Sequence, residues 1–209
     1  MWISSLLFRR SSKNPKGFTL IELVVVVAIM VLITATILVR QARFDSSTLL
    51  RSLSYSVALT VRSAQVYGVS VRGTVSGGAT VFAPAYGAYF NNANSYILFA
   101  DINGNGAYDS SVDTVVQTYQ LGSGFQITKF CGKQGGGTLR CSTDAAPITW
   151  LAIYFKRPNP DALFASSAGE AYGSACIQLA AVNDTGNTHT VTASLTGQIA
   201  VGVSGSTCI

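Results

Sequence analysis

Charge and histidine are scarce in this chain of 209 residues. Only 11% of the residues are charged, and the one histidine is His189. No Ser-His-Asp or Cys-His arrangement with a familiar spacing surrounds it, and no phosphate-binding loop occurs. Carboxylates are paired only in one Asn-Gly segment, and no cysteine stands in a C-x-x-C pair, which argues against zinc and thioredoxin-like sites. We therefore expect no enzymatic activity and interpret His189 as structural or merely solvated.

The net charge of +5 is unevenly distributed along the chain. Residues 1–17 carry four cations and no acid, and residues 18–72 carry five cations and two acids. Residues 73–209 carry five cations and seven acids, so most of the chain is mildly acidic. The positive charge belongs to the front of the chain, which argues against a protein that binds nucleic acid through a generally basic surface.

A long apolar run follows the basic front. Residues 18–39 read FTLIELVVVVAIMVLITATILV and contain one charge, Glu22. A helix of this length spans about 33 Å, close to the thickness of a bilayer core. The preceding cations place the N-terminus in the cytoplasm and the chain after Arg43 outside. A secretory signal has a shorter apolar stretch and a small-residue cleavage site, and a plain signal anchor leaves the carboxylate unexplained.

The segment KGFTLIE (16–22) resembles the type IV prepilin signature, in which a basic leader ends in glycine and a glutamate follows at the fifth position after the cut. The resemblance implies that prepilin peptidase cleaves between Gly17 and Phe18 on the cytoplasmic side. It implies that Phe18 becomes an N-methylated terminus. It also implies that Glu22 pairs with the terminal amine of a neighbouring subunit during assembly, which gives this buried carboxylate a partner.

The pattern beyond the apolar run predicts an α+β fold. Apolar residues recur at helical spacing up to Ala64, and no proline lies between Pro15 and Pro84, so we predict one helix to about Tyr67, ended by Gly68. β-like runs follow, with hairpin turns at 184–187 and 196–197. The runs are 79–82, 86–90, 96–100, 114–121, 125–130, 148–155, 175–182, 188–195 and 198–203.

The predicted architecture is a long N-terminal helix, with a transmembrane stem and an amphipathic half, packed on a mostly antiparallel β-sheet head, as in the type IV pilin-like fold. The leader is residues 1–17, and the transmembrane and assembly helix is 18–40. The extracytoplasmic head is 41–209, and it includes the amphipathic half of the helix, 41–67.

The head also resembles the GspH/FimT type of minor pilins and pseudopilins. The resemblance rests on VRSAQVYGVSV (61–71), YILFADINGNGAYD (96–109) and TVTASLTGQIAVG (190–202), which lie in this order along the chain. It implies a subunit of a type IV pilus or of a type II secretion pseudopilus, held in the bacterial inner membrane with its head in the periplasm before assembly. The implied partners are other pilin subunits, prepilin peptidase and the inner-membrane assembly platform.

The segment DINGNGAYD (101–109) places oxygen-bearing side chains at alternate positions around a glycine, which can supply calcium ligands. Position 12 of an EF-hand would be Val112 rather than glutamate, and the flanking segments are β-like, which excludes a complete EF-hand. The alternative is an Asn-Gly turn between two strands. Calcium is therefore a possible cofactor, and its candidate ligands are Asp101, Asn103, Asn105, Asp109 and Asp113.

Four cysteines lie in the predicted extracytoplasmic part, where disulfides persist. Cys131 and Cys141 bracket nine residues and are the favoured pair. The remaining pair, Cys176 and Cys208, requires the chain after Val203 to fold back across the sheet.

The alternative function is that of a filament-tip subunit that binds DNA for uptake. It needs an outward cationic patch, for which the head offers Lys129, Lys133 and Arg140. The net charge of −2 over residues 73–209 argues against it.

Overall fold

The computed structural model describes residues 17–91 and 94–208. The predicted leader, 1–17, therefore lies outside the described residues except for Gly17. The chain divides into two compact units, Met1–Phe44 and Asp45–Ile209.

The α-helix α1 (Leu20–Val69) contributes to both units, because the boundary falls within it. In the first unit, the large apolar side chains from Phe18 to Leu38 are 48–82% exposed. The segment Leu20–Leu38 is long and apolar enough to cross a membrane. Such a surface requires lipid or other protein chains around it.

In the second unit, α1 buries one apolar stripe, as its spacing predicts. Leu50, Val57, Val61 and Ala64 are fully buried. The expectation that Gly68 ends the helix is wrong, because α1 continues to Val69. A Cβ on Gly68 would overlap the backbone carbonyl of Phe155, so this glycine permits a close approach of the helix to the sheet.

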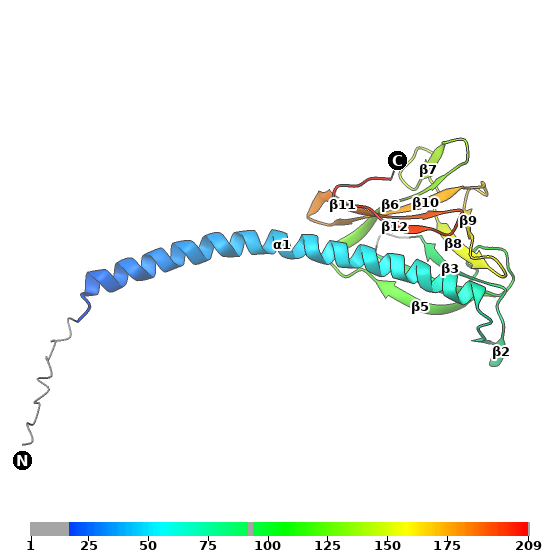
Figure 1. The fold of residues 1–209 in the computed structure, drawn as a ribbon, viewed down its shortest axis with the longest axis horizontal. Helices are drawn as coiled ribbons and strands as arrows, with labels where there is room; N and C mark the ends of the chain where they lie inside the picture. The colour runs from blue at the N-terminus through cyan, green and yellow to red at the C-terminus, as the bar shows by residue number, and fades with distance from the viewer. Residues whose placement is uncertain (1–16, 92–93, 209) are drawn as a thin grey trace, which may run out of the picture. The chain divides into compact units, whose positions relative to one another are not determined.

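Twelve strands follow within the described residues, and all their pairings are antiparallel. They form a hairpin, β1–β2, and two five-stranded sheets in the orders β5-β4-β3-β8-β9 and β12-β11-β10-β6-β7 (Figure 1). The strands are β1 (Thr74–Ser76), β2 (Ala79–Val81), β3 (Ala85–Phe90), β4 (Ser95–Asp101), β5 (Thr114–Gln120), β6 (Phe125–Lys133), β7 (Leu139–Cys141), β8 (Leu151–Lys156), β9 (Ala162–Ser166), β10 (Ser174–Ala181), β11 (Asp184–Ser194) and β12 (Ile199–Val201).

The α+β prediction is confirmed, and each of the nine predicted runs overlaps a strand. Three short strands, β1, β7 and β9, were not predicted. The turn predicted at 184–187 is wrong, because Ala181 pairs with Asp184 and the turn is therefore at 182–183. A register shift next to Ala181 leaves residues 185–187 as a bulge in β11, which accommodates the glycine of this stretch.

The main buried cluster joins the second half of α1 to side chains from both five-stranded sheets. Its largest fully buried members include Phe90 of β3, Phe155 of β8 and Ile177 of β10. The amphipathic half of α1 is therefore part of the core of this unit. His189 is buried as well, with Nδ1 3.2 Å from the carbonyl oxygen of Gly202.

Candidate functional site

The predicted cleavage site lies immediately before α1. Residues 17–19 are not helical, and Phe18 is 81% exposed. A Cβ on Gly17 would meet no atom within 4 Å, so packing within the described residues does not require glycine there. An exposed, non-helical peptide bond between Gly17 and Phe18 suits binding in extended form by a peptidase.

Glu22 lies in the first turn of α1 and is exposed. Its backbone N–H donates to Thr19 Oγ1 at 3.3 Å, which makes Thr19 the N-cap of the helix. The order Thr-Leu-Ile-Glu matches a capping box, and the helix dipole favours negative charge at this end. The position of Glu22 is therefore compatible with helix capping as well as with the pairing that the prepilin resemblance implies.

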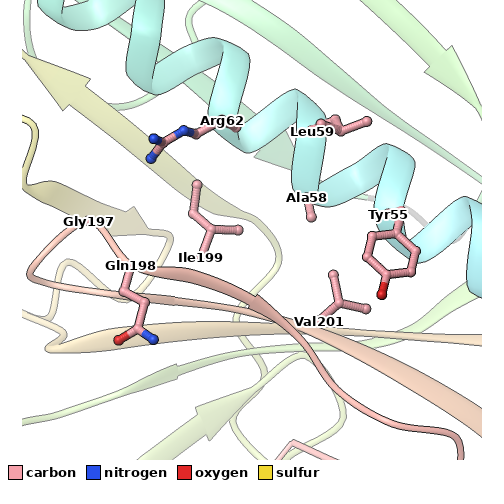
Figure 2. Close-up of a pocket in the computed structure, with 8 residues that line it drawn as sticks. All are labelled: Tyr55, Ala58, Leu59, Arg62, Gly197, Gln198, Ile199 and Val201. Atoms are coloured by element: carbon pink, nitrogen blue, oxygen red, sulfur yellow. The ribbon is translucent and has the colours of Figure 1, made fainter.

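A groove that was not predicted from the sequence lies beside the second half of α1. Four helix residues, two residues that precede β12 and two residues of β12 line about 470 Å³ (Figure 2). Its lining from the helix includes Tyr55, Leu59 and Arg62, which lie off the buried stripe. Their four- and three-residue spacing, continued by Val66, is a second helical period that was present in the sequence. The lining is Tyr55, Ala58, Leu59, Arg62, Gly197, Gln198, Ile199 and Val201.

The candidate calcium residues lie in and beside the loop between β4 and β5. Asp101 is fully buried, and its two carboxylate oxygens accept the N–H groups of Gly104 at 2.6 Å and Gly106 at 2.8 Å. Asp113 likewise accepts the N–H groups of Ile102 and Asp109, both at 2.8 Å. Burial raises the pKa of Asp101, and the amide hydrogen bonds partly oppose that rise.

Each of the other three candidate ligands accepts a hydrogen bond from the backbone N–H of the residue two positions later in the chain. The acceptors are Asn103, Asn105 and Asp109, and the donors are Asn105, Ala107 and Ser111. No cluster of three or more His, Cys, Asp or Glu positioned for a metal occurs in the described part of the chain. The loop is thus organised by its own backbone amides, and calcium binding stays a prediction.

The structure contains both disulfides, Cys131–Cys141 and Cys176–Cys208. The chain after β12 does fold back: Gly205 N–H donates to Thr188 O at 2.7 Å, and Cys208 N–H donates to Gln178 Oε1 at 3.2 Å. These bonds carry the tail across β11 to β10, where Cys176 lies.

The three cations suggested for DNA binding are not brought together. Successive side chains of a strand point to opposite faces of its sheet. Lys129 and Lys133 of β6 are four positions apart and therefore share one face, whereas Gly132, next to Lys133, belongs to the other face. Arg140 of β7 pairs with Gly132 and shares its face. Strand alternation, which the spacing of charges along the sequence does not reveal, separates Arg140 from the lysines.

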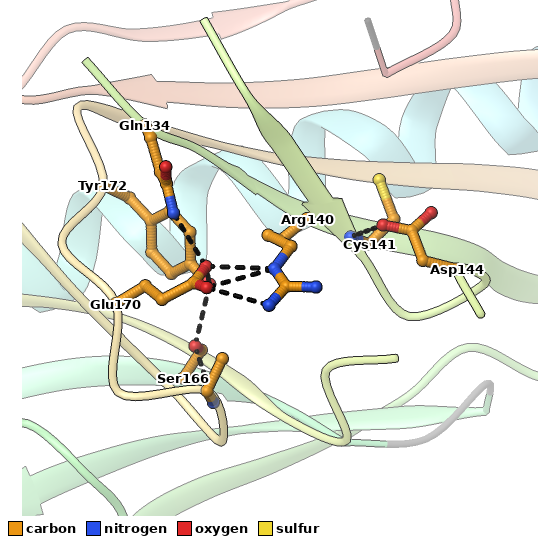
Figure 3. Close-up of polar contacts among 8 residues, drawn as sticks. Gln134, Arg140, Cys141, Asp144, Ser166, Glu170 and Tyr172 are labelled. Atoms are coloured by element: carbon orange, nitrogen blue, oxygen red, sulfur yellow. Dashed lines mark hydrogen bonds and ion pairs between the residues drawn. The ribbon is translucent and has the colours of Figure 1, made fainter. Parts of the chain in front are cut away.

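Arg140 is also neutralised by an acid. Its Nη2 lies 2.9 Å from Glu170 Oε1, and its Nε donates to both carboxylate oxygens at 3.1 and 3.2 Å (Figure 3). Gln134 and Tyr172 donate to the same carboxylate at 2.9 and 3.3 Å. The pair raises the pKa of Arg140 and lowers the pKa of Glu170, chiefly through these hydrogen bonds.

A family model described as the prokaryotic N-terminal methylation motif matches residues 12–38. The match includes the predicted cleavage site, Phe18, Glu22 and most of the exposed apolar part of α1. No curated protein and no solved structure matches the chain significantly. The chain therefore carries the N-terminal motif of the type IV pilin-like proteins, the substrates of prepilin peptidase.

Proposed function

We propose that this chain is a minor pilin or pseudopilin of the GspH/FimT type, a subunit of a type IV pilus or of a type II secretion pseudopilus. The observation that carries the proposal is the methylation motif at residues 12–38, joined through one helix to a compact α+β unit. Before assembly, the segment Leu20–Leu38 anchors the chain in the inner membrane, with the N-terminus cytoplasmic and the head in the periplasm.

Assembly exchanges lipid contacts of the apolar segment for contacts with the helices of other subunits. The exposed side chains from Phe18 to Leu38 provide the surface for that exchange. Cleavage after Gly17 creates a new amine at Phe18. The carboxylate of Glu22 in one subunit and the amine of Phe18 in its neighbour then form an ion pair. Burial of this pair in an apolar bundle costs less free energy than burial of an isolated charge.

The experiment is Glu22→Val in the full-length chain, with Thr36→Val as the matched control. Both variants replace a polar residue of the apolar segment with valine, but Thr36 Oγ1 already bonds to Ile33 O within its own helix at 2.8 Å. Cleavage is read from the mass of the mature chain, and assembly from its recovery with sheared filaments. We expect both variants to be cleaved and only Glu22→Val to assemble poorly. Normal assembly of Glu22→Val, or absence of cleavage after Gly17, would overturn the proposal.

DNA capture at a filament tip has less support, because Arg140 is paired with Glu170 and faces away from Lys129 and Lys133. A gel shift at several salt concentrations tests it directly. DNA binding by the wild type that disappears when both lysines are changed to alanine would restore this function.

A further inference from the structure

The strand β12 is the edge of its sheet within the described residues, since it pairs with β11 alone. Next to it, Ser194 N–H donates to Gln198 O at 3.0 Å, and Gly202 N–H donates to Thr190 O at 2.7 Å. Along an antiparallel ladder, residue pairs that exchange backbone hydrogen bonds alternate with pairs that do not. Ile199 and Val201, which lie between these pairs, therefore direct their backbone N–H and C=O groups away from β11, toward the open edge.

One flank of α1 lies across a groove from this edge strand. The side chains of Ile199 and Val201 are packed against the core, whereas Tyr55 and Leu59 of α1 are 48% and 65% exposed. These residues line the 470 Å³ groove, and Figure 2 shows the helix side chains on one side and β12 on the other. An apolar flank of the helix and the open edge strand thus line one groove.

The groove is held in shape by Gln65. Its side-chain N–H groups donate to Pro160 O at 2.7 Å and to Gly197 O at 3.2 Å, which ties the helix to the turn before β12. Gly197 has a φ of +78°, and a Cβ there would overlap Pro160 O. Because the groove is already formed, little conformational entropy of its own residues is lost when a segment binds.

Arg62 supplies a charge at the groove. Its guanidinium donates to Gln65 Oε1, and the one ion pair between side chains in the described residues is Arg140–Glu170, so no carboxylate there pairs with Arg62. An incoming acidic side chain would complement this cation in a partly apolar setting.

We propose that the groove between α1 and β12 binds an extended segment of a neighbouring subunit, which adds to the sheet as a further strand. The segment forms backbone hydrogen bonds with Ile199 and Val201, places apolar side chains over Tyr55 and Leu59, and sets an acidic residue against Arg62. A strand is the occupant because only an extended backbone pairs with an open sheet edge. This inference rests on the proposed function, since it requires assembly with other subunits.

The first test is hydrogen exchange of the full-length chain, in detergent micelles and in recovered filaments. Fragmentation of the peptide that contains β12 resolves single amides. We expect the amides of Ile199 and Val201 to exchange about tenfold more slowly, or slower still, in filaments. The amide of Ala200, which faces β11, serves as the internal control and should change little. Filaments in which Ile199 and Val201 exchange as fast as in micelles would overturn the inference while leaving the proposed function intact.

The second test uses two variants of the groove. Val201→Pro removes an N–H that points to the open edge and spares the ladder with β11, a position where edge strands tolerate proline. Leu59→Asn removes the apolar cover, and Leu49→Asn is its control, because Leu49 is 54% exposed on α1 but does not line the groove. We expect both groove variants, but not the control, to enter filaments about tenfold less while remaining folded and cleaved.

The outcomes separate the two proposals. Groove variants that assemble like the wild type overturn the strand addition. A wild-type chain that is never cleaved or never enters a filament overturns the proposed function, and the strand addition with it. If a groove variant is unfolded in micelles, the exchange of Ile199 and Val201 in wild-type filaments decides the matter.

Discussion

Cys131 and Cys176 lie directly opposite each other on β6 and β10, and each forms a disulfide with a different partner. Cys131 also lies opposite Cys141 on β7, so its bridge joins two strands that are already paired. The bridge from Cys176 instead ties down the tail after β12 at Cys208. The two disulfides are neighbours in space but constrain the unfolded chain to different extents.

Removal of the second disulfide is expected to destabilise the chain more than removal of the first. The closed segments have sequence separations of 32 and 10 residues, and the chain-entropy estimate gives about 4 and about 3 kcal/mol. The comparison is Cys176→Ser with Cys208→Ser against Cys131→Ser with Cys141→Ser, by denaturant unfolding of the full-length chain in detergent. Equal losses, or a larger loss for the shorter loop, would contradict the entropic argument.

Much of this fold is readable from local patterns. The stripe of Leu50, Val57 and Val61 and the motif around Glu22 lie within short windows of sequence, where helical period and residue type are visible. β1 and β7 have three residues each, too few for a period of two to stand out. The separation of Arg140 from Lys129 depends on the register of β7 against β6, which is set by contacts that no single window contains.

The pair of Arg140 and Glu170 predicts a dependence of stability on pH. Hydrogen bonds from the guanidinium hold the pKa of Glu170 below its usual value of 4.5. A carboxyl group with a lowered folded-state pKa contributes stability above its unfolded-state pKa and loses it as the pH falls through the folded-state value. Glu170→Gln should therefore be less stable than the wild type at pH 6, and the difference should shrink as the pH falls below 4.5, the usual pKa of the group.

The measurement is the thermal midpoint of both chains between pH 6 and pH 3, at low and high salt. The side chains of Arg140 and Glu170 are 36% and 26% exposed, so solvent screens the pair and salt should shrink the difference. Asp161→Asn, at an exposed acidic residue elsewhere in the head, is the control. Parallel curves for Glu170→Gln and the wild type would rule out the contribution of this pair.

Asp101 is expected to stabilise the loop between β4 and β5 whether or not calcium binds. Asp101→Ala removes the acceptor of two amides, those of Gly104 and Gly106, and should cost about 1–3 kcal/mol. Denaturant unfolding in chelator measures this loss, with Asp161→Ala as the control. An unchanged stability would mean that water satisfies the two amides equally well.

The calcium prediction is tested on the wild type and on Asp101→Ala. Binding to the folded state raises the midpoint of unfolding, so calcium should raise that of the wild type relative to chelator and have little effect on Asp101→Ala. A wild-type midpoint that is the same in calcium and in chelator would exclude the metal site and leave the loop as an Asn-Gly turn.

Gly68→Ala separates helix propensity from packing at the end of α1. Alanine in a helix interior is favoured over glycine by about 1 kcal/mol, so propensity alone predicts a more stable chain. The added Cβ would overlap the backbone carbonyl of Phe155 in β8, which cannot move without disturbing the ladder with β3. The packing effect should be the larger one, with a net loss of about 1–3 kcal/mol in the free energy of unfolding.

Gly136→Ala is the control: it adds the same methyl group where no atom lies within 4 Å and should change the free energy of unfolding by less than about 0.5 kcal/mol. A higher midpoint of unfolding for Gly68→Ala would show that α1 and β8 are not held at the close approach described above.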